Sequence, residues 1–326
     1  MSPSFFVRPA LRRMLRAATL GVAALLASCG GGTQIEPFVP TRVLAFGDEL
    51  SVLEPDGRKY SINAFKLVTA GGITIEDPTT LDCTRNPLWV QTVASGFGLT
   101  FDRCQGTAPK ASGQVLAQPG HDVLDFAGQV AAVQGDALGE KDLALVMFGL
   151  NDVLKLYARY PGTSRDALLD EARARGTALG AQINELARRG PAVVVVTMPD
   201  IGLSPFALAQ NVSTGDATRS ALISELVKVF NDRMSIKLIN DGRLIGLVYG
   251  DIELQNMVKF PANYGLANVV DAACKPEPPL PGCTNATLVD TATAVTWLWA
   301  DSLRLSPVGQ SRLGVLAESR ARSNPF

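Results

Sequence analysis

Short apolar runs alternate along the chain with longer stretches of helical periodicity. Four runs are almost continuously hydrophobic, as is typical of strands that are buried on both faces of a parallel sheet. They lie at residues 41–47, 142–148, 192–198 and 244–249. Four other stretches repeat apolar residues at helical spacing. They lie at residues 88–97, 122–133, 164–189 and 214–240.

This alternation predicts an α/β fold, a three-layer α/β/α domain with a mostly parallel sheet and right-handed crossovers. Residues 41–326 are expected to form this single domain. Ligands of such sheets bind beyond the carboxyl ends of the strands, so residues 47–49 and 149–152 are expected to border a site. Residues 54–87 and 199–213 lack a clear period and are predicted to form irregular loops beside it.

Residues 1–28 have the features of an export signal. Four arginines precede an apolar stretch at residues 17–26 that is too short to cross a bilayer. Leu26-Ala27-Ser28-Cys29 resembles a bacterial lipobox, in which Cys29 would be acylated and become the mature N-terminus, followed by a Gly-rich tether at residues 29–40. The alternative is an ordinary secretory signal in which Cys29 is incidental.

An anchor at Cys29 would make a membrane the partner of this chain and the bacterial cell envelope its location. Gly30 is not the aspartate that signals inner-membrane retention in some bacteria, which favours the outer membrane, facing the periplasm. Removing the signal takes away four arginines and no acid, so the net charge moves from −1 to about −5. A negative chain of this kind is not expected to bind nucleic acid. The sequence indicates no cofactor.

The cysteines agree with an oxidising compartment. Beyond Cys29 there are four, in two pairs that are local in sequence. We predict the disulfides Cys83–Cys104 and Cys274–Cys283, because these close the shortest loops of the three connectivities. A metal site is disfavoured, since no C-x-x-C spacing occurs and the only histidine is distant in sequence.

Several ordered motifs resemble those of the SGNH, or GDSL-type, hydrolases and cover nearly the whole mature chain. FGDELS at residues 46–51 is similar to the family's FGDSLS, and residues 117–120 loosely resemble the block whose glycine, here Gly120, donates a backbone N–H to the oxyanion. GLND at residues 149–152 keeps the G-x-N-D form, in which Asn151 would be the side-chain donor. DSLRLSPVG at residues 301–309 resembles D-x-x-H-L-S-P-x-G.

A further stretch, YGLANVVDAAC at residues 264–274, is similar to the lecithinase and autotransporter-esterase branch of that family. The resemblance implies a three-layer, flavodoxin-like fold and the chemistry of esterases and lipases. It also implies an acyl-ester or lipid ligand. Asp301 would be the acid that orients the catalytic histidine three residues later.

Two departures change the chemistry that this resemblance implies. Glu49 stands where the family has its nucleophilic serine, and Arg304 stands where it has its histidine base. An arginine cannot accept a proton near neutral pH, so both halves of the nucleophile–base pair are missing. We predict instead an ion pair between Glu49 and Arg304, shared with Asp301, that fills the catalytic cleft.

Other residues offer less for hydrolysis. Ser51 is expected to point away from the site, and His121 follows Gly120 but is a lone histidine. Glu49 could act beside Asp48 and Asp152 as carboxylates do in glycosidases, although the family positions of both aspartates favour structural roles.

Asn151 and Gly120 are either a retained oxyanion hole or ties between loops, with equal weight. The sequence therefore predicts an envelope lipoprotein that is a pseudoenzyme. It would be a catalytically impaired homologue of esterases or lipases and would act in binding. The alternative is an active hydrolase of carboxyl esters with a rearranged site. A purely structural envelope protein is the third class.

Overall fold

The computed structural model describes residues 37–108 and 111–326. The predicted export signal, Cys29 and most of the tether lie outside the described residues. Residues Phe38–Phe326 form one compact unit. Across the described ranges, no helix is both long and apolar enough to cross a membrane.

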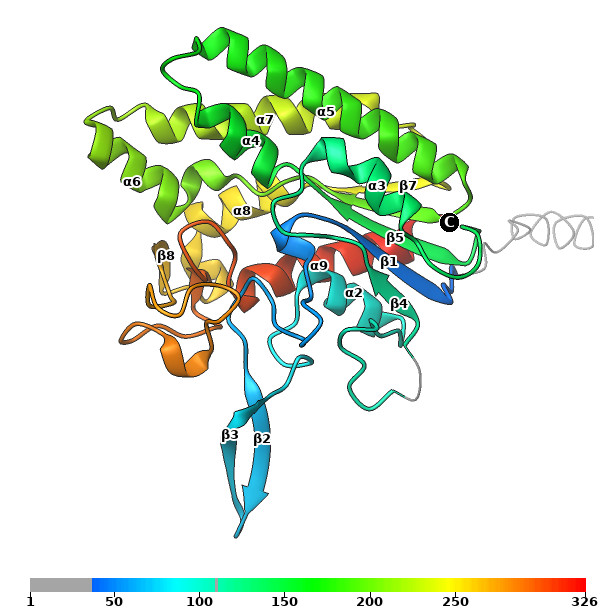
Figure 1. The fold of residues 1–326 in the computed structure, drawn as a ribbon, viewed down its shortest axis with the longest axis vertical. Coiled ribbons are helices and arrows are strands. Elements are labelled where there is room, and N and C mark those ends of the chain that lie inside the picture. Colours follow the sequence, from blue (N-terminus) through cyan, green and yellow to red (C-terminus); the bar gives the residue numbers. More distant parts are fainter. Residues whose placement is uncertain (1–36, 109–110) are drawn as a thin grey trace, which may run out of the picture. The chain divides into compact units, whose positions relative to one another are not determined.

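A five-stranded parallel sheet forms the centre of the unit (Figure 1). Its strands are β1 (Arg42–Gly47), β4 (Gly113–Val115), β5 (Asp142–Met147), β6 (Ala192–Val196) and β7 (Ile245–Val248). Their order across the sheet is β4-β1-β5-β6-β7 and every neighbouring pair is parallel. Counted along the chain, this is the flavodoxin-like order 2-1-3-4-5, in which the winding reverses beside the first strand. The predicted α/β fold with a mostly parallel sheet is confirmed.

The strands are buried on both faces, which explains their continuous apolar runs. Val43 and Ala45 of β1 point to one face of the sheet and belong to a core cluster that includes residues of helices α2 (Trp89–Gly96) and α9 (Pro307–Ser323). Leu44 and Phe46 belong to a second cluster with the helices on the other face. The first layer contains α2 and α9, and the second contains α3 (Phe126–Ala131), α5 (Arg165–Arg188) and α7 (Arg219–Lys237). The architecture therefore has the three expected layers.

In the second layer, the backbones of α5 and α7 pack closely against each other. A Cβ atom placed on Gly176 would lie 2.1 Å from the carbonyl oxygen of Phe230, so a larger residue cannot fit there without moving a helix. The glycine is therefore explained by the approach of the two backbones and not by a turn.

Residues 199–213 differ from the prediction, because most of them form a helix. α6 (Pro205–Thr214) begins after Ser204, whose Oγ accepts the backbone N–H of Ala207, with Pro205 in the first helical turn. A serine cap followed by proline is a helix-start signal that outweighs the missing period. α4 (Leu150–Tyr157) and α8 (Gly250–Lys259) complete the helices near the carboxyl ends of the strands, and β8 (Asn268–Ala272) pairs with β9 (Trp297–Trp299) outside the main sheet.

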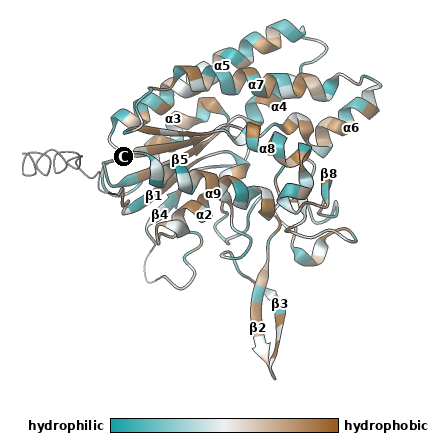
Figure 2. Ribbon diagram, turned by 180° about the vertical axis from the view of Figure 1, so that it is seen from behind, coloured by the Kyte–Doolittle hydropathy of each residue, from teal (hydrophilic) through white to brown (hydrophobic). Residues whose placement is uncertain are grey.

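Residues 54–87 also differ from the prediction of an irregular loop. Their middle part forms an antiparallel hairpin of β2 (Phe65–Ala70) and β3 (Ile73–Leu81), which projects from the rest of the unit (Figure 1). Gly71 and Gly72 make its turn, with φ of 60° and 80°. Both strands carry hydrophobic residues, brown in Figure 2. We call this element the hairpin arm.

The root of the hairpin arm is held by a buried lysine and a disulfide. The Lys59 side chain is 0% exposed, and its Nζ donates to three backbone carbonyls in the segment that follows β3. They belong to Cys83 at 3.1 Å, Arg85 at 2.5 Å and Asn86 at 2.9 Å. Cys83 is also bonded to Cys104, and Cys274 to Cys283, so both predicted disulfides are confirmed.

Burial of Lys59 makes the stability of this root depend on pH. Desolvation lowers the pKa of Lys59 to about 7 from its usual 10.5, against a small opposing effect of Asp82. Between these values the unfolded chain binds more protons than the folded one. The free energy of unfolding is therefore expected to rise between pH 7 and 10, by at most about 1.4 kcal/mol per pH unit. Urea unfolding at several pH values should show a rise that Lys59→Met lacks, and equal slopes in both proteins would contradict it.

Candidate functional site

The residues singled out in the sequence come together at the carboxyl end of the sheet, where the winding reverses between β1 and β5. Glu49 begins the short 3-10 helix η1 (Glu49–Ser51) directly after β1, and Asn151 lies in the first turn of α4 after β5. His121 lies in the loop after β4. Arg304 lies in the loop between β9 and α9.

Glu49 is the centre of this group, and its side chain is almost closed off from solvent, with 7% exposed. Its Oε2 accepts a 2.7 Å hydrogen bond from Asn151 Nδ2. Its Oε1 accepts from Arg304 Nη2 at 3.4 Å. Both carboxylate oxygens are therefore occupied by donors of the protein itself.

The predicted ion pair between Glu49 and Arg304 is present and includes Asp301. Arg304 Nη1 donates to Asp301 Oδ2 at 2.9 Å, while Asp301 Oδ1 accepts the backbone N–H groups of Leu303 and Arg304. Burial lowers the pKa of Arg304, but the charges of Asp301 and Glu49 outweigh it and hold the pKa above its usual value. The guanidinium is therefore a fixed cation that cannot serve as a general base.

Asn151 connects the loop after β1 to the loop after β4. Its Nδ2 has two hydrogens, and these go to Glu49 Oε2 and, at 3.0 Å, to the carbonyl of His121. A substrate carbonyl would therefore have to displace one of these bonds before Asn151 could donate to it. Gly120, the other expected oxyanion donor, is exposed, with φ of 79°.

The ring of His121 is oriented by a glutamine of α3. Gln129 Nε2 lies 3.0 Å from His121 Nδ1 and also donates to the carbonyl of Gly47. An amide nitrogen only donates, so Nδ1 of a neutral ring accepts and the ring proton is on Nε2. In this arrangement the histidine has no free lone pair for a base.

Asp48 and Asp152 connect the loops beneath the site, as the structural interpretation expects. Asp48 accepts the backbone N–H groups of Leu50 and Leu150, so it joins the loop after β1 to the start of α4. Burial raises the pKa of Asp48, and the charge of Glu49 raises it further. Asp152 is paired with Arg175 of α5 at 2.9 Å, and burial raises its pKa against this pairing.

Two other residues complete the surroundings of the site. Ser51 points into the core, where its Oγ accepts from Trp89 Nε1 at 3.0 Å, so it is not available as a nucleophile. The ring of Tyr60 lies 5.9 Å from the guanidinium carbon of Arg304. Sequence reasoning missed Tyr60, because nothing in the local pattern places it beside a residue more than 200 positions away.

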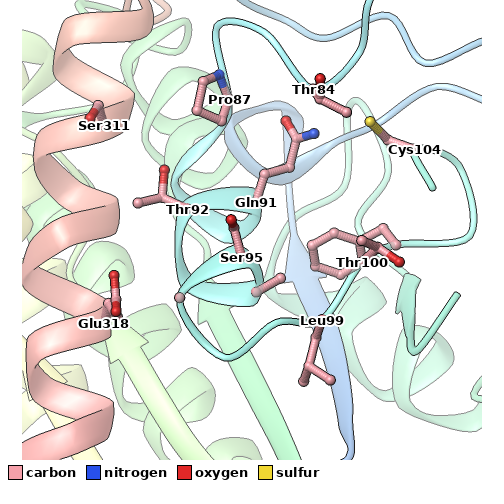
Figure 3. Close-up of a pocket in the computed structure, with 13 residues that line it drawn as sticks. Thr84, Pro87, Gln91, Thr92, Ser95, Leu99, Thr100, Cys104, Ser311 and Glu318 are labelled. Atoms are coloured by element: carbon pink, nitrogen blue, oxygen red, sulfur yellow. The ribbon is translucent and has the colours of Figure 1, made fainter. Parts of the chain in front are cut away.

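A cavity of about 430 Å³ lies elsewhere, between α2, the loop after it and α9 (Figure 3). Gln91, Thr100 and Glu318 are among its lining residues, and none of the site residues described above lines it. Within residues 37–108 and 111–326, no group of three or more His, Cys, Asp or Glu side chains could hold a metal ion.

The sequence matches no known family model and no curated protein. Solved structures with similarity include an acetylxylan esterase from Geobacillus stearothermophilus, with 15% identity over 88% of this chain and 96% of that chain and a TM-score of 0.39. A lipase/acylhydrolase from Enterococcus faecalis has 16% identity over 86% and 95%, with a TM-score of 0.38.

An alpha/beta hydrolase enzyme from the metagenome of Lake Arreo, Spain, has 13% identity over 87% of this chain and 97% of that chain, with a TM-score of 0.40. Similarities at this level carry no argument about activity. The fold assignment therefore rests on the strand order and layers described above, and the chemistry on the residues of the site.

Proposed function

We propose that this chain is an envelope lipoprotein related to the SGNH hydrolases, anchored to the outer membrane through Cys29, that binds a ligand without turning it over. The observation that carries the proposal is the Glu49–Arg304 ion pair at the positions where the family resemblance places a serine and a histidine. A carboxylate and a guanidinium together cannot generate the activated hydroxyl that ester hydrolysis by this route needs.

The arrangement of Asn151 supports the same proposal. In a hydrolase of this class the corresponding donor stabilises negative charge on the reacting oxygen. Here the Oε2 atom of Glu49 accepts that donor at 2.7 Å. The negative charge of the Glu49 carboxylate therefore already occupies the donor that would stabilise the negative charge of a transition state.

The ligand that we propose is an acyl ester or a lipid, which is the ligand class that the family resemblance implies. The alternative function is hydrolysis of carboxyl esters through Glu49, Asp301 and His121. Two contacts speak against it. Both oxygens of Glu49 are engaged, and Gln129 binds the lone pair that His121 would need.

The proposal predicts that the mature protein does not react with a fluorophosphonate probe and does not hydrolyse p-nitrophenyl acetate or butyrate above the buffer rate. Probe labelling requires an activated hydroxyl, and Ser51 is bound to Trp89 within the core. In-gel fluorescence and release of p-nitrophenol measure the two outcomes.

Glu49→Gln is the matched control for these assays, because it removes the charge and keeps the size of the side chain. Turnover by the unmodified protein that Glu49→Gln abolishes would establish the alternative function. Turnover that survives in Glu49→Gln would come from a contaminant or another site.

A further inference from the structure

Near its tip the hairpin arm has an apolar face, and nearer the root the charged pair of Lys66 and Asp77 lies on the same side. The cross-strand pairs Val68 with Ile75 and Ala70 with Ile73 share a face, because residues directly opposite each other point to the same side. Thr69 pairs with Thr74 on the opposite face, where their hydroxyls lie 2.9 Å apart, and Leu67 pairs with Glu76 on that same face nearer the root. The tip of the arm, from Val68 to Ile75, is therefore amphipathic.

The apolar face is exposed to solvent. The exposed fraction is 36% for Val68, 68% for Ile73 and 56% for Ile75. Apolar side chains gathered on a projecting element are uncommon on a soluble surface and mark a place that another surface covers. The stretch from Leu67 to Ile75 carries no charge, so nothing along the tip opposes such a contact.

Hydrogen bonds and an ion pair at the root of the arm fix its position relative to the rest of the unit. Arg85 Nη1 donates to the carbonyl of Phe65 and, at 2.8 Å, to Glu76 Oε1, which also accepts from Asn285 Nδ2 at 3.1 Å. Lys59 and the disulfide at Cys83 fix the chain beyond β3. A two-stranded hairpin is only marginally stable alone, so these contacts are what keep the arm extended.

We propose that the hairpin arm lays its Val68–Ala70–Ile73–Ile75 face into the boundary between headgroups and acyl chains of a phospholipid membrane. Amphipathic elements bind there with the apolar face about 5–10 Å deep. At that depth the open edges of β2 and β3 still meet water and headgroups, as unpaired backbone groups require. The proposal is independent of whether the Glu49 site hydrolyses esters.

Area and charge favour a membrane over a second copy of this chain. Four small aliphatic side chains bury at most on the order of 400 Å², about half of the roughly 800 Å² that each partner buries in a stable protein interface. Lys66, Glu76 and Asp77 are the charged residues near the tip, which leaves no basic cluster. The contact is therefore apolar, and a zwitterionic lipid suffices.

The test is tryptophan fluorescence of the full chain carrying Ile73→Trp, mixed with phosphatidylcholine vesicles with and without brominated acyl chains. The native tryptophans are at least 91% buried and give a constant background. We expect the emission of the new tryptophan to shift to the blue and to lose intensity with brominated lipid. Ile236→Trp, on α7 and 74% exposed in the unmodified protein, should show neither change.

Two added substitutions separate the faces of the arm. Adding Ile75→Asp to Ile73→Trp should abolish the quenching, because it places a charge on the apolar face. Adding Thr74→Asp, which places the same charge on the opposite face, should preserve it. Circular dichroism checks that each variant is folded.

Absence of quenching in folded Ile73→Trp overturns the proposal. A blue shift that needs no lipid and grows with protein concentration also overturns it, in favour of a second copy packed on the arm. Equal loss of quenching with Ile75→Asp and Thr74→Asp contradicts the assignment of the membrane-facing side.

Discussion

The double variant Glu49→Ser/Arg304→His is expected to hydrolyse short-chain p-nitrophenyl esters about 10²–10⁴ times faster than the buffer reaction, which the unmodified protein does not exceed. Serine at position 49 would follow β1 beside Asn151, whose Nδ2 loses the carboxylate that it binds now. Histidine at position 304 would find Asp301 free to orient it, because Asp301 Oδ2 now accepts from Arg304 Nη1. Release of p-nitrophenol and labelling by a fluorophosphonate measure the gain.

The single variants are the controls for this gain. Glu49→Ser alone keeps a cation that cannot act as base, and Arg304→His alone lacks a nucleophile, so neither is expected to turn over esters. Adding Asn151→Ala to the double variant should reduce the new activity by about 10²–10³ if Asn151 serves as an oxyanion donor. An inactive but folded double variant would falsify the assignment of positions 49 and 304 to a replaced serine and histidine.

Loss of Arg304 alone is expected to destabilise the protein strongly. Arg304→Met leaves the carboxylate of Glu49, with 7% of its side chain exposed, without its cation. Removal of one partner of a buried pair costs about 3–5 kcal/mol, and we expect the lower end because 23% of the Arg304 side chain is exposed. Urea unfolding of Arg304→Met, Glu49→Gln and the combined variant measures the cost.

A double-mutant cycle shows whether this cost belongs to the pair. The combined variant should be more stable than the sum of the single losses predicts, by about 1–2 kcal/mol. Arg58→Met is the surface control, since Arg58 and its partner Asp56 are about half exposed and such pairs contribute about 1 kcal/mol or less. Additive losses in the cycle would mean that Glu49 and Arg304 act independently.

The main sheet could be predicted from the sequence because burial on both faces makes each long strand a continuous apolar run. The hairpin arm could not be recognised by that criterion, since most of β2 and β3 is exposed and the second strand contains Pro78, a residue that disfavours a strand in sequence-based prediction. A signal was present nevertheless. Gly71-Gly72 between two apolar stretches is the turn pattern of a hairpin, and it outweighs the irregular composition around it.

The site could be predicted as far as its residues follow strand ends or sequence motifs. Glu49, Asn151, Asp301 and Arg304 were placed in this way, and all four lie in one hydrogen-bonded group. The contacts of Tyr60 could not be predicted, because they depend on how distant loops pack. The same holds for Arg175 on Asp152 and for Gln129 on His121.

The closed group of Glu49, Arg304 and Asp301 has a consequence for the ligands that can approach it. Two carboxylates face one guanidinium, so the group carries a net charge of about −1 when all three are ionised. A fatty acid or a phosphate monoester would meet repulsion there, whereas an intact ester or a positively charged headgroup would not. The group is therefore expected to discriminate against the carboxylic acid that hydrolysis of an ester releases.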